Sequence, residues 1–300
     1  MGIDIHNLNF MAHAQDLGVR FERSLAIGRQ VLHVEPRGLQ AHRRLRGLPD
    51  LPLSSGTPWF EPLLQQWYGA VEADSVDASA YEGASILHDM NLPWPAQDAA
   101  RGHYDAVLDF GCLEHVFDFP TAWRNLVAVT RVGGHILHAL PANNLCGHGF
   151  YQFSPELFFN LYRPEQGFDL KAVYFAIRTE PRHWWRVANP LTVRRRVNLC
   201  NGHEVYLLVL ARKLAELPPG PAPQQSDYAM GDWIANGQAG APAPAHAAPH
   251  PATTWLDRAG QLDRARRWRD RFRALRGAVL DLPAPDYQRL VVDRLIARSP

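Results

Sequence analysis

The chain has 300 residues, of which 46% are hydrophobic and 10% aromatic, enough to bury the core of one large domain with or without appendages. Its formal net charge of +1 provides no general attraction to nucleic acid, so we expect no nucleic-acid partner. The three cysteines, Cys112, Cys146 and Cys200, form no CxxC pair, and an odd number argues against a disulfide framework and fits a reducing cytoplasm.

The sequence contains no recognisable targeting or membrane-spanning segment. The first seven residues, Met-Gly-Ile-Asp-Ile-His-Asn, lack a basic region followed by an apolar stretch, so we expect no signal peptide. No run of 18 apolar residues occurs, so we expect no transmembrane helix. These expectations favour a cytoplasmic protein.

The N-terminal part is predicted to contain one strand among helices and loops. Residues 1–23 resemble a helical lead-in, and residues 23–28 a short strand that ends at Gly28. Residues 37–46 fit a short Arg-rich helix. Four prolines and a Ser-Ser-Gly make residues 47–62 a loop, which a helical turn follows.

Strand candidates then follow at regular intervals. They are residues 71–77, 84–89, 105–110, 135–140, 170–177 and 204–211, which gives about seven strands in all. Between two of them, residues 121–130 have helical spacing and end near Gly133-Gly134, so this part is predicted to form a βαβ unit. Ser154 and Pro155 are a typical N-cap and first helical residue.

The composition changes after residue 215. Residues 216–254 are rich in Pro, Ala, Gly and Gln, which predicts a disordered linker. Residues 255–300 are predicted to form a helical tail, because apolar residues from Trp255 to Val279 recur every three or four positions. Eight Arg and three Asp between residues 255 and 276 give this tail a local charge of +5 (8 − 3), so it could contact a protein partner, an anionic membrane or its own domain. The interleaving of Arg with Asp favours a partner or its own domain.

Acidic residues stand at the ends of successive strand candidates. Asp77, Asp89 and Asp109 hold these positions. Carboxylates there suit a nucleoside ligand, because they accept hydrogen bonds from ribose hydroxyls and from an adenine amino group. Structural alternatives stay open: Asp77 as a cap on the following turn, and Asp89 as an Asx-turn before Pro93.

Together these segments resemble a known family. The run Asp105-Ala-Val-Leu-Asp-Phe-Gly-Cys-Leu-Glu-His-Val is the most specific part, and with its neighbours it resembles the second to fifth strands of class I S-adenosylmethionine-dependent methyltransferases. The resemblance covers roughly residues 23–211. It implies an α/β domain over residues 1–215 with a mostly parallel, seven-stranded Rossmann-like sheet, and S-adenosylmethionine as cofactor.

The resemblance also implies roles for individual residues. Asp77 would hold the ribose, Asp89 would accept from the adenine amino group, and Met90 would pack on the ring. Asp109 and Gly111 would line the pocket. Residues expected to face the substrate are Glu114, Asn143, Asn144 and Tyr151, and candidate general bases are His148 and His115. The alternative for the loop after residue 143 is a tight turn whose His and Asn side chains cap backbone groups.

The first loop departs from the family pattern. Where the family has Gly-x-Gly-x-Gly, this chain has Ala26-Ile-Gly-Arg-Gln, so only Gly28 remains. Arg29 could bind the cofactor carboxylate through a bidentate contact, or it could fill the space that the cofactor needs.

Other chemistries have weaker support. Among the 14 His, only tertiary coincidence could bring His115, His148 and His203 together, so we expect no metal. Cys112 follows Gly111 as in a nucleophile elbow, but the second glycine of that motif is absent. Arg residues near Trp184-Trp185 could bind a ligand by stacking, or belong to a solvated hairpin over packed Trp side chains.

The sequence therefore favours one function and leaves one alternative. The favoured function is methyl transfer from S-adenosylmethionine to a small molecule or glycan precursor. The alternative is a catalytically inactive methyltransferase-like scaffold that binds partners through its C-terminal helix.

Overall fold

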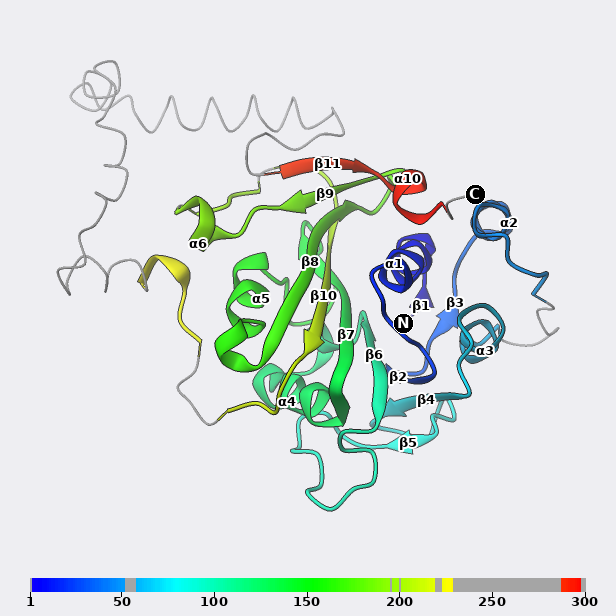
Figure 1. The fold of residues 1–300 in the computed structure, drawn as a ribbon, viewed down its shortest axis with the longest axis horizontal. Coiled ribbons are helices and arrows are strands. Elements are labelled where there is room, and N and C mark those ends of the chain that lie inside the picture. The colour runs from blue at the N-terminus through cyan, green and yellow to red at the C-terminus, as the bar shows by residue number, and fades with distance from the viewer. Residues whose placement is uncertain are drawn as a thin grey trace.

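A nine-stranded mixed sheet runs through the protein in the order β11-β9-β8-β10-β7-β6-β2-β4-β5 (Figure 1). The computed structural model describes residues 2–51, 58–194, 196–199, 201–218, 223–228 and 287–297. The strands of this sheet are β2 (Arg23–Ile27), β4 (Glu72–Asp77), β5 (Ile86–Leu87), β6 (Tyr104–Phe110), β7 (Thr130–Asn143), β8 (Phe168–Ile177), β9 (His183–Val187), β10 (Val205–Lys213) and β11 (Tyr287–Val291). A small parallel pair, β1 (Gly2–Ile3) and β3 (Val31–Leu32), lies beside it.

The sheet has a parallel half and an antiparallel half. Strands β5, β4, β2, β6 and β7 are parallel neighbours. β10 runs antiparallel between β7 and β8, and β9 and β11 continue the antiparallel pairing. The expected mostly parallel, seven-stranded sheet was therefore wrong in direction and number. A connection of only five residues, 178–182, joins β8 to β9, and a connection that short permits an antiparallel partner but not a parallel one.

Helices cover both faces of the sheet (Figure 1). They are α1 (Ile5–Asp16), α2 (Pro36–Arg46), α3 (Glu61–Tyr68), α4 (Phe119–Val129), α5 (Pro155–Leu161), α6 (Pro190–Val193) and α10 (Val292–Ile296), with 3-10 turns η1 (Leu113–His115) and η2 (Pro164–Gln166). Val107 of β6 packs in a core with α4 and α5, whereas Leu108 packs in a second core with α1 and α3. All of β6 is buried, which explains why it appears in the sequence as a nearly unbroken apolar run.

Most predicted elements in the first 215 residues are confirmed. The helices expected at 37–46 and 121–130 are α2 and α4, and the Ser154 side chain accepts from the Glu156 N–H at 3.2 Å. Gly133-Gly134, expected to stop a helix, lies instead inside β7. Trp184 and Trp185 are fully buried in β9. This burial agrees with the interpretation that they pack inside the protein and disfavours the one in which they stack on a ligand.

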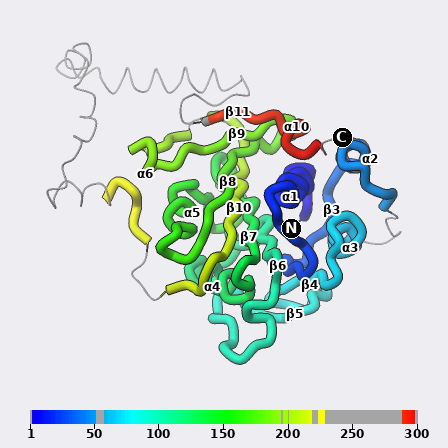
Figure 2. The backbone as a smooth tube through the Cα atoms, in the orientation of Figure 1, coloured from blue at the N-terminus to red at the C-terminus, as the bar shows by residue number. Residues whose placement is uncertain are grey.

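The C-terminal residues return to the main sheet. β11 pairs with β9, and α10 contacts α1 and α2 (Figure 2). Residues 287–291 are thus a strand where a helical tail was expected, and the predicted helix from Trp255 to Val279 lies outside the described residues, as does most of the predicted linker. None of the helices in the described ranges combines the length and apolar character needed to cross a bilayer.

The strand order reverses between β2 and β6. From β2 the chain continues to β4 and β5 on one side, and then passes to β6 and β7 on the other. The loops that leave the carboxyl ends of β2 and β6 therefore diverge. In open α/β sheets, ligands bind at this reversal of strand order.

We expect Arg46→Leu to destabilise the protein by about 3 kcal/mol, because Arg46 is a buried cation with several partners. Its Nη1 donates to Asp16 Oδ2 and to the carbonyl of Ile296, both at 2.7 Å. The control is Arg43→Leu, which removes only a surface pair with the exposed Asp50 and should cost under about 1 kcal/mol. Urea unfolding of both variants tests this, and equal losses would contradict a buried anchor at Arg46.

We expect stability to fall as the pH is lowered from about 6.5 to 4. Burial, and then Arg46, lower the pKa of His42 to about 4, and burial lowers that of His135 to about 4 as well. In this window the unfolded chain binds protons that the folded chain excludes, so each such His contributes a loss approaching roughly 3 kcal/mol. Unfolding of His42→Gln should show a shallower dependence on pH than the parent chain, and an unchanged slope would refute the assignment.

Candidate functional site

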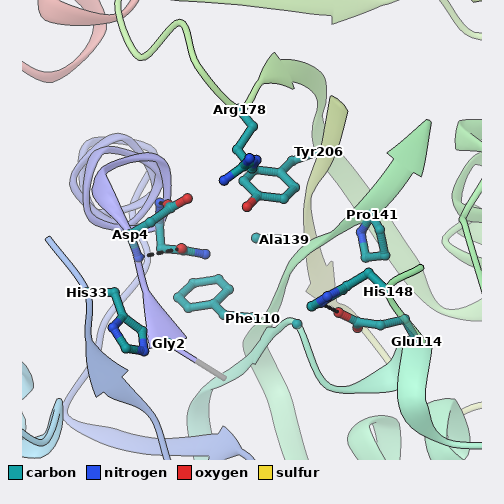
Figure 3. A pocket seen from close by; sticks show the side chains of 12 residues that line it. Gly2, Asp4, His33, Phe110, Glu114, Ala139, Pro141, His148, Arg178 and Tyr206 are labelled. Atoms are coloured by element: carbon teal, nitrogen blue, oxygen red, sulfur yellow. Dashed lines mark hydrogen bonds and ion pairs between the residues drawn. The ribbon is translucent and has the colours of Figure 1, made fainter. Parts of the chain in front are cut away.

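A cavity of about 350 Å³ lies beyond the carboxyl ends of β6 and β7 (Figure 3). Phe110, Ala139 and Pro141 supply apolar surface to it. Polar groups come from other elements, and together the lining residues are Gly2, Asp4, Asn7, His33, Phe110, Gly111, Glu114, Ala139, Pro141, His148, Arg178 and Tyr206. A largely apolar wall with a few convergent polar groups, at this volume, is typical of a small-molecule site.

The turn after β6 carries Glu114 into this cavity. Gly111 has a φ of +84°, which reverses the chain after Phe110. Asp109 Oδ1 then accepts from the N–H groups of Cys112 and Leu113 at 3.2 and 3.1 Å, which holds the first turn of η1. Glu114 follows within η1 and lines the cavity.

Asp109 is an internal structural residue. It is fully buried, and its Oδ2 lies 2.7 Å from His138 Nδ1, while His138 Nε2 lies 2.6 Å from the Tyr162 hydroxyl. Both carboxylate oxygens are therefore occupied by groups of the protein itself. These contacts favour a structural role for Asp109 over the predicted contact with cofactor, because the turn after β6 and the neighbouring strand use its lone pairs.

Glu114 is a buried carboxyl without hydrogen-bond donors. It has no exposed surface, and neither of its oxygens has a hydrogen-bond partner among the described residues. Burial, and next the negative charge of Asp109, raise the pKa of Glu114 to about 8. A carboxyl in such a setting is costly unless a ligand, proton or cation completes it.

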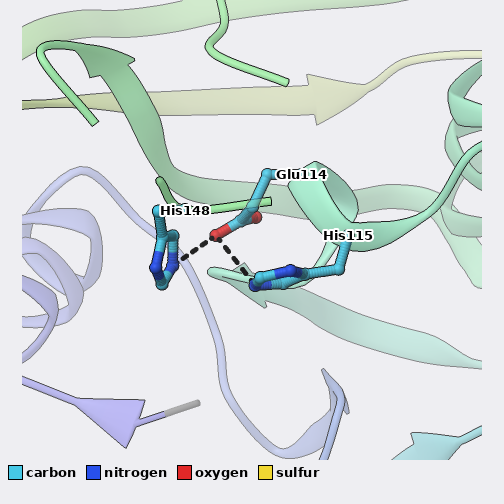
Figure 4. A group of neighbouring side chains, drawn as sticks. All are labelled: Glu114, His115 and His148. Carbon is cyan, nitrogen blue, oxygen red and sulfur yellow. Dashed lines mark ion pairs between the residues drawn. The ribbon is translucent and has the colours of Figure 1, made fainter. Parts of the chain in front are cut away.

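Two histidines lie against Glu114 (Figure 4). His148 Nε2 is 3.3 Å and His115 Nε2 is 3.8 Å from Glu114 Oε1, and the two rings meet edge to face with centroids 5.0 Å apart. Both imidazoles are partly exposed, 54% for His148 and 42% for His115. Burial, followed by the nearby His148, lowers the pKa of His115, which favours the neutral ring.

The loop after β7 is fastened to the turn after β6. The N–H groups of Phe150 and Tyr151 donate to the Glu114 carbonyl at 2.7 and 3.3 Å. The Tyr151 hydroxyl donates to the Phe117 carbonyl at 2.6 Å. Tyr151, expected to face the substrate, therefore braces the loop that presents His148.

Asn143 and Asn144 brace the same loop from its other side. The side-chain amide of Asn144 donates to the carbonyls of Asn201 and His203 at 3.0 and 2.7 Å, and that of Asn143 reaches Asn201 Oδ1 at 3.3 Å. Neither residue lines the cavity. The structural alternative for these two residues, a loop in which Asn side chains cap backbone groups, matches the contacts of Asn144.

The residues expected to hold the nucleoside lie together at the carboxyl ends of β2, β4 and β5. The Gly28 N–H donates to the Val76 carbonyl at 2.7 Å, and the Asp77 carbonyl accepts from the His88 N–H at 2.9 Å. Met90, two residues further on, is buried. None of these residues lines the cavity, but β2 and β6 are parallel neighbours, so their carboxyl ends lie at the same edge of the sheet.

Each strand-end aspartate also caps a local turn. Asp77 Oδ1 accepts from the Ser79 N–H at 3.0 Å, and Asp89 Oδ1 accepts from the backbone and side-chain N–H groups of Asn91 at 2.9 and 2.8 Å. These Asn91 bonds lower the pKa of Asp89 and so favour its ionised form. The Oδ2 atoms of both aspartates have no hydrogen bond to another described residue, so each retains a free acceptor.

Arg29 is held entirely by groups of the protein. Its Nε donates to Glu61 Oε1 at 2.8 Å, and its Nη1 donates to the carbonyls of Glu82 and Gly83 at 2.7 and 3.0 Å. The guanidinium also lies 4.2 Å from the centre of the Trp59 ring. Arg29 thus connects the first loop to the turn after β4 by hydrogen bonds. It occupies a position in the loop that lacks the additional glycines of the family pattern.

Several cavity residues were not predicted from the sequence. Asp4 is the N-cap of α1, and its Ile-Asp-Ile-His-Asn context was a recognisable capping signal that could have placed it. Arg178 and Tyr206 carry no comparable local signal, because β8 and β10 become neighbours only in the folded sheet. Burial raises the pKa of the Cys112 thiol, which argues against a thiolate nucleophile there.

No protein-family model matches the chain, and no curated protein matches it. Solved structures similar to it include S-adenosylmethionine-dependent methyltransferases. The 1,6-didemethyltoxoflavin-N1-methyltransferase of Burkholderia thailandensis, with bound S-adenosylhomocysteine, aligns at 17% identity over 70% of this chain and 78% of its own, with a TM-score of 0.40.

Two further solved structures resemble the chain. A possible histamine N-methyltransferase of Thermotoga maritima aligns at 14% identity over 70% of this chain and 91% of its own, with a TM-score of 0.37. The [4+2]-cyclase SpnF aligns at 13% identity over 69% and 80%, with a TM-score of 0.38. At these identities and TM-scores, the likenesses leave the activity of this chain to be argued from its own site.

We expect Gly149→Ala to disturb the site. Gly149 has a φ of +80°, and a Cβ there would lie 2.6 Å from the Glu114 carbonyl oxygen, so the loop must shift at a cost of about 1–3 kcal/mol. Gly147→Ala is the matched control, because a Cβ there meets nothing within 4 Å. Thermal unfolding should separate the two variants, and equal melting temperatures would contradict the close contact at Gly149.

Proposed function

We propose that the protein is an S-adenosylmethionine-dependent methyltransferase that acts on a small molecule or glycan precursor. The proposal rests on where the candidate residues lie in the sheet. Two strand-end aspartates with free acceptors, Asp77 and Asp89, lie at the same edge of the sheet as the cavity that Glu114 and His148 line. This continuous edge lies at the reversal of strand order, where open α/β sheets bind their ligands.

The nucleoside end of the cofactor fits the residues present. Asp77 Oδ2 would accept from ribose hydroxyls, Asp89 Oδ2 from the adenine amino group, and Met90 would pack on the base, as the resemblance implies. Gly28 leaves the position after β2 without a side chain. Arg29 has two of its nitrogens occupied within the protein, so we propose that it shapes the first loop instead of binding the cofactor carboxylate.

The cavity would hold the methyl acceptor. S-adenosylmethionine, when bound, supplies an activated methyl group. The protein contributes mainly alignment, which is effective because it removes the entropy cost of bringing two reactants together. If the acceptor is a hydroxyl, a neutral imidazole of His148, which lines the cavity, or of the neighbouring His115 can take its proton.

A non-catalytic scaffold is the second candidate, and two observations favour it. Arg29 closes the first loop onto Glu61 and Gly83, and both aspartates already cap their own turns. The predicted partner-binding helix lies outside the described residues.

The end of the tail does not add to this support. β11 and α10 contact the protein's own sheet and helices, which favours an intramolecular role for residues 287–297 over binding of a partner.

Calorimetric titration with S-adenosylhomocysteine distinguishes the two candidates. We expect micromolar binding, roughly −8 kcal/mol, to the parent chain. Asp89→Ala should weaken it at least about tenfold, or about 1.4 kcal/mol, because a charge-assisted acceptor is lost. Asp98→Ala is the matched control, since Asp98 likewise caps a turn, through the Ala100 N–H at 2.7 Å, but at a site remote from the proposed nucleoside residues.

Either result is informative. Binding that is lost in Asp89→Ala and kept in Asp98→Ala supports the enzyme. No binding at millimolar S-adenosylhomocysteine would refute the enzyme and leave the scaffold as the better description.

A further inference from the structure

We propose that Glu114, His115 and His148 form a binding site for a divalent transition-metal ion at the wall of the cavity. One donor atom from each residue lies within 4.8 Å of the other two (Figure 4). The residues come from two loops, the turn after β6 and the loop after β7, so the site exists only in the folded chain. Within the described residues this is the one group of three such side chains with that geometry.

The distances suit a shared ion. Metal–ligand bonds of about 2.0–2.2 Å place adjacent ligand atoms about 3.0–3.5 Å apart. His148 Nε2 is 3.3 Å and His115 Nε2 is 3.8 Å from Glu114 Oε1. The first distance already lies in this range and the second is slightly longer, so the three donors are close to the spacing that one shared ion requires.

The buried carboxyl of Glu114 independently points to a ligand. The residue has no exposed surface, both oxygens lack hydrogen-bond donors among the described residues, and Oε1 is directed at the two imidazoles (Figure 4). Neither His115 nor His148 forms a hydrogen bond with it in this arrangement. A cation between the three side chains would supply the positive charge that a buried carboxylate requires.

The backbone around the cluster is already in place. Phe150 and Tyr151 donate N–H groups to the Glu114 carbonyl, which fixes the His148 loop on the turn that carries Glu114 and His115. Close approach is possible because position 149 is Gly, since a Cβ there would lie 2.6 Å from that carbonyl. Ligands held by such backbone contacts lose little freedom when the ion binds.

The donor set defines the class of ion. Two imidazoles and one carboxylate are typical of Zn²⁺ sites with a catalytic role and of non-haem Fe²⁺ sites. Mg²⁺ and Ca²⁺ prefer oxygen ligands, so they fit poorly. Three protein ligands leave coordination positions open, and Glu114 and His148 both line the cavity, so these positions face the space for a small molecule.

An open position there would bind an oxygen of the methyl acceptor, a step that rests on the proposed function. A bound metal ion lowers the pKa of a coordinated hydroxyl, so the acceptor proton leaves to water and the oxygen becomes a better nucleophile. With the ion bound, His115 and His148 are metal ligands and no longer serve as proton acceptors. The acceptor class that follows is a small molecule with a hydroxyl, phenol or carboxyl group. Metal binding itself does not depend on methyl transfer.

Titration of the tag-free, chelator-treated full chain with Zn²⁺ and Co²⁺ tests the proposal. We expect one ion per chain by calorimetry and a Co²⁺ visible absorption band typical of nitrogen and oxygen ligands. We expect each of three substitutions to weaken Zn²⁺ binding by more than roughly 100-fold: Glu114→Gln, His115→Asn and His148→Asn. The reason is that loss of a residue that only supports a metal ligand already weakens binding roughly 10- to 100-fold. Circular dichroism of each variant checks that it is folded.

His103→Asn is the matched control. His103 and Glu72 form another His–carboxylate contact, at 2.8 Å, near the amino ends of β4 and β6 and without a third donor in reach. Binding unchanged in His103→Asn and lost in the three cluster variants supports the site. Absence of one-to-one binding, or binding that persists in folded cluster variants, would overturn it.

S-adenosylhomocysteine titrated into the same samples separates this inference from the proposed function. Metal binding without nucleoside binding would support the metal site and refute the methyltransferase. Nucleoside binding without metal binding would do the reverse, because the two sets of residues do not overlap.

Discussion

The buried carboxylate of Asp109 is the interaction on which the candidate site depends. It accepts two backbone N–H groups of the turn after β6 and contacts His138 of β7, which in turn reaches Tyr162 after α5. A charge with no exposed surface must be satisfied internally, so these four segments have little freedom to move independently. This fixed frame sets the direction in which Glu114 leaves the sheet.

Glu114 differs from Asp109 in its hydrogen bonding. It lies five residues from Asp109, equally buried but with no hydrogen-bond donors, and the charge of Asp109 adds to the burial that raises its pKa. The fold thus supplies hydrogen bonds to one carboxylate and none, among the described residues, to the other. The metal proposal concerns Glu114 because this buried carboxyl lacks hydrogen-bond donors among the described residues and lies beside two imidazoles.

The parallel and antiparallel halves of the sheet contribute different residues to the proposed site. Parallel strands bring the ends of β2, β4 and β5 to one edge, where the residues proposed to hold the nucleoside lie. The antiparallel strands β8 and β10 add Arg178 and Tyr206 to the far wall of the cavity. β9 and β11 extend this half and bury Trp184 and Trp185, so the C-terminal segment supports the sheet that shapes the cavity.

Local patterns determined much of this protein from the sequence alone. Apolar runs located seven strands but not β1, β3, β9 or β11. Capping residues such as Ser154 located helix starts, and strand-end acids marked the edge that holds Asp77 and Asp89, because these signals act within a few residues. The direction of β10, the docking of β11 and the internal use of Asp109 depend on partners distant in the chain. The same holds for His115 and His148, which are 33 positions apart and meet at Glu114 only because β6 and β7 are parallel neighbours whose following loops share one edge of the sheet.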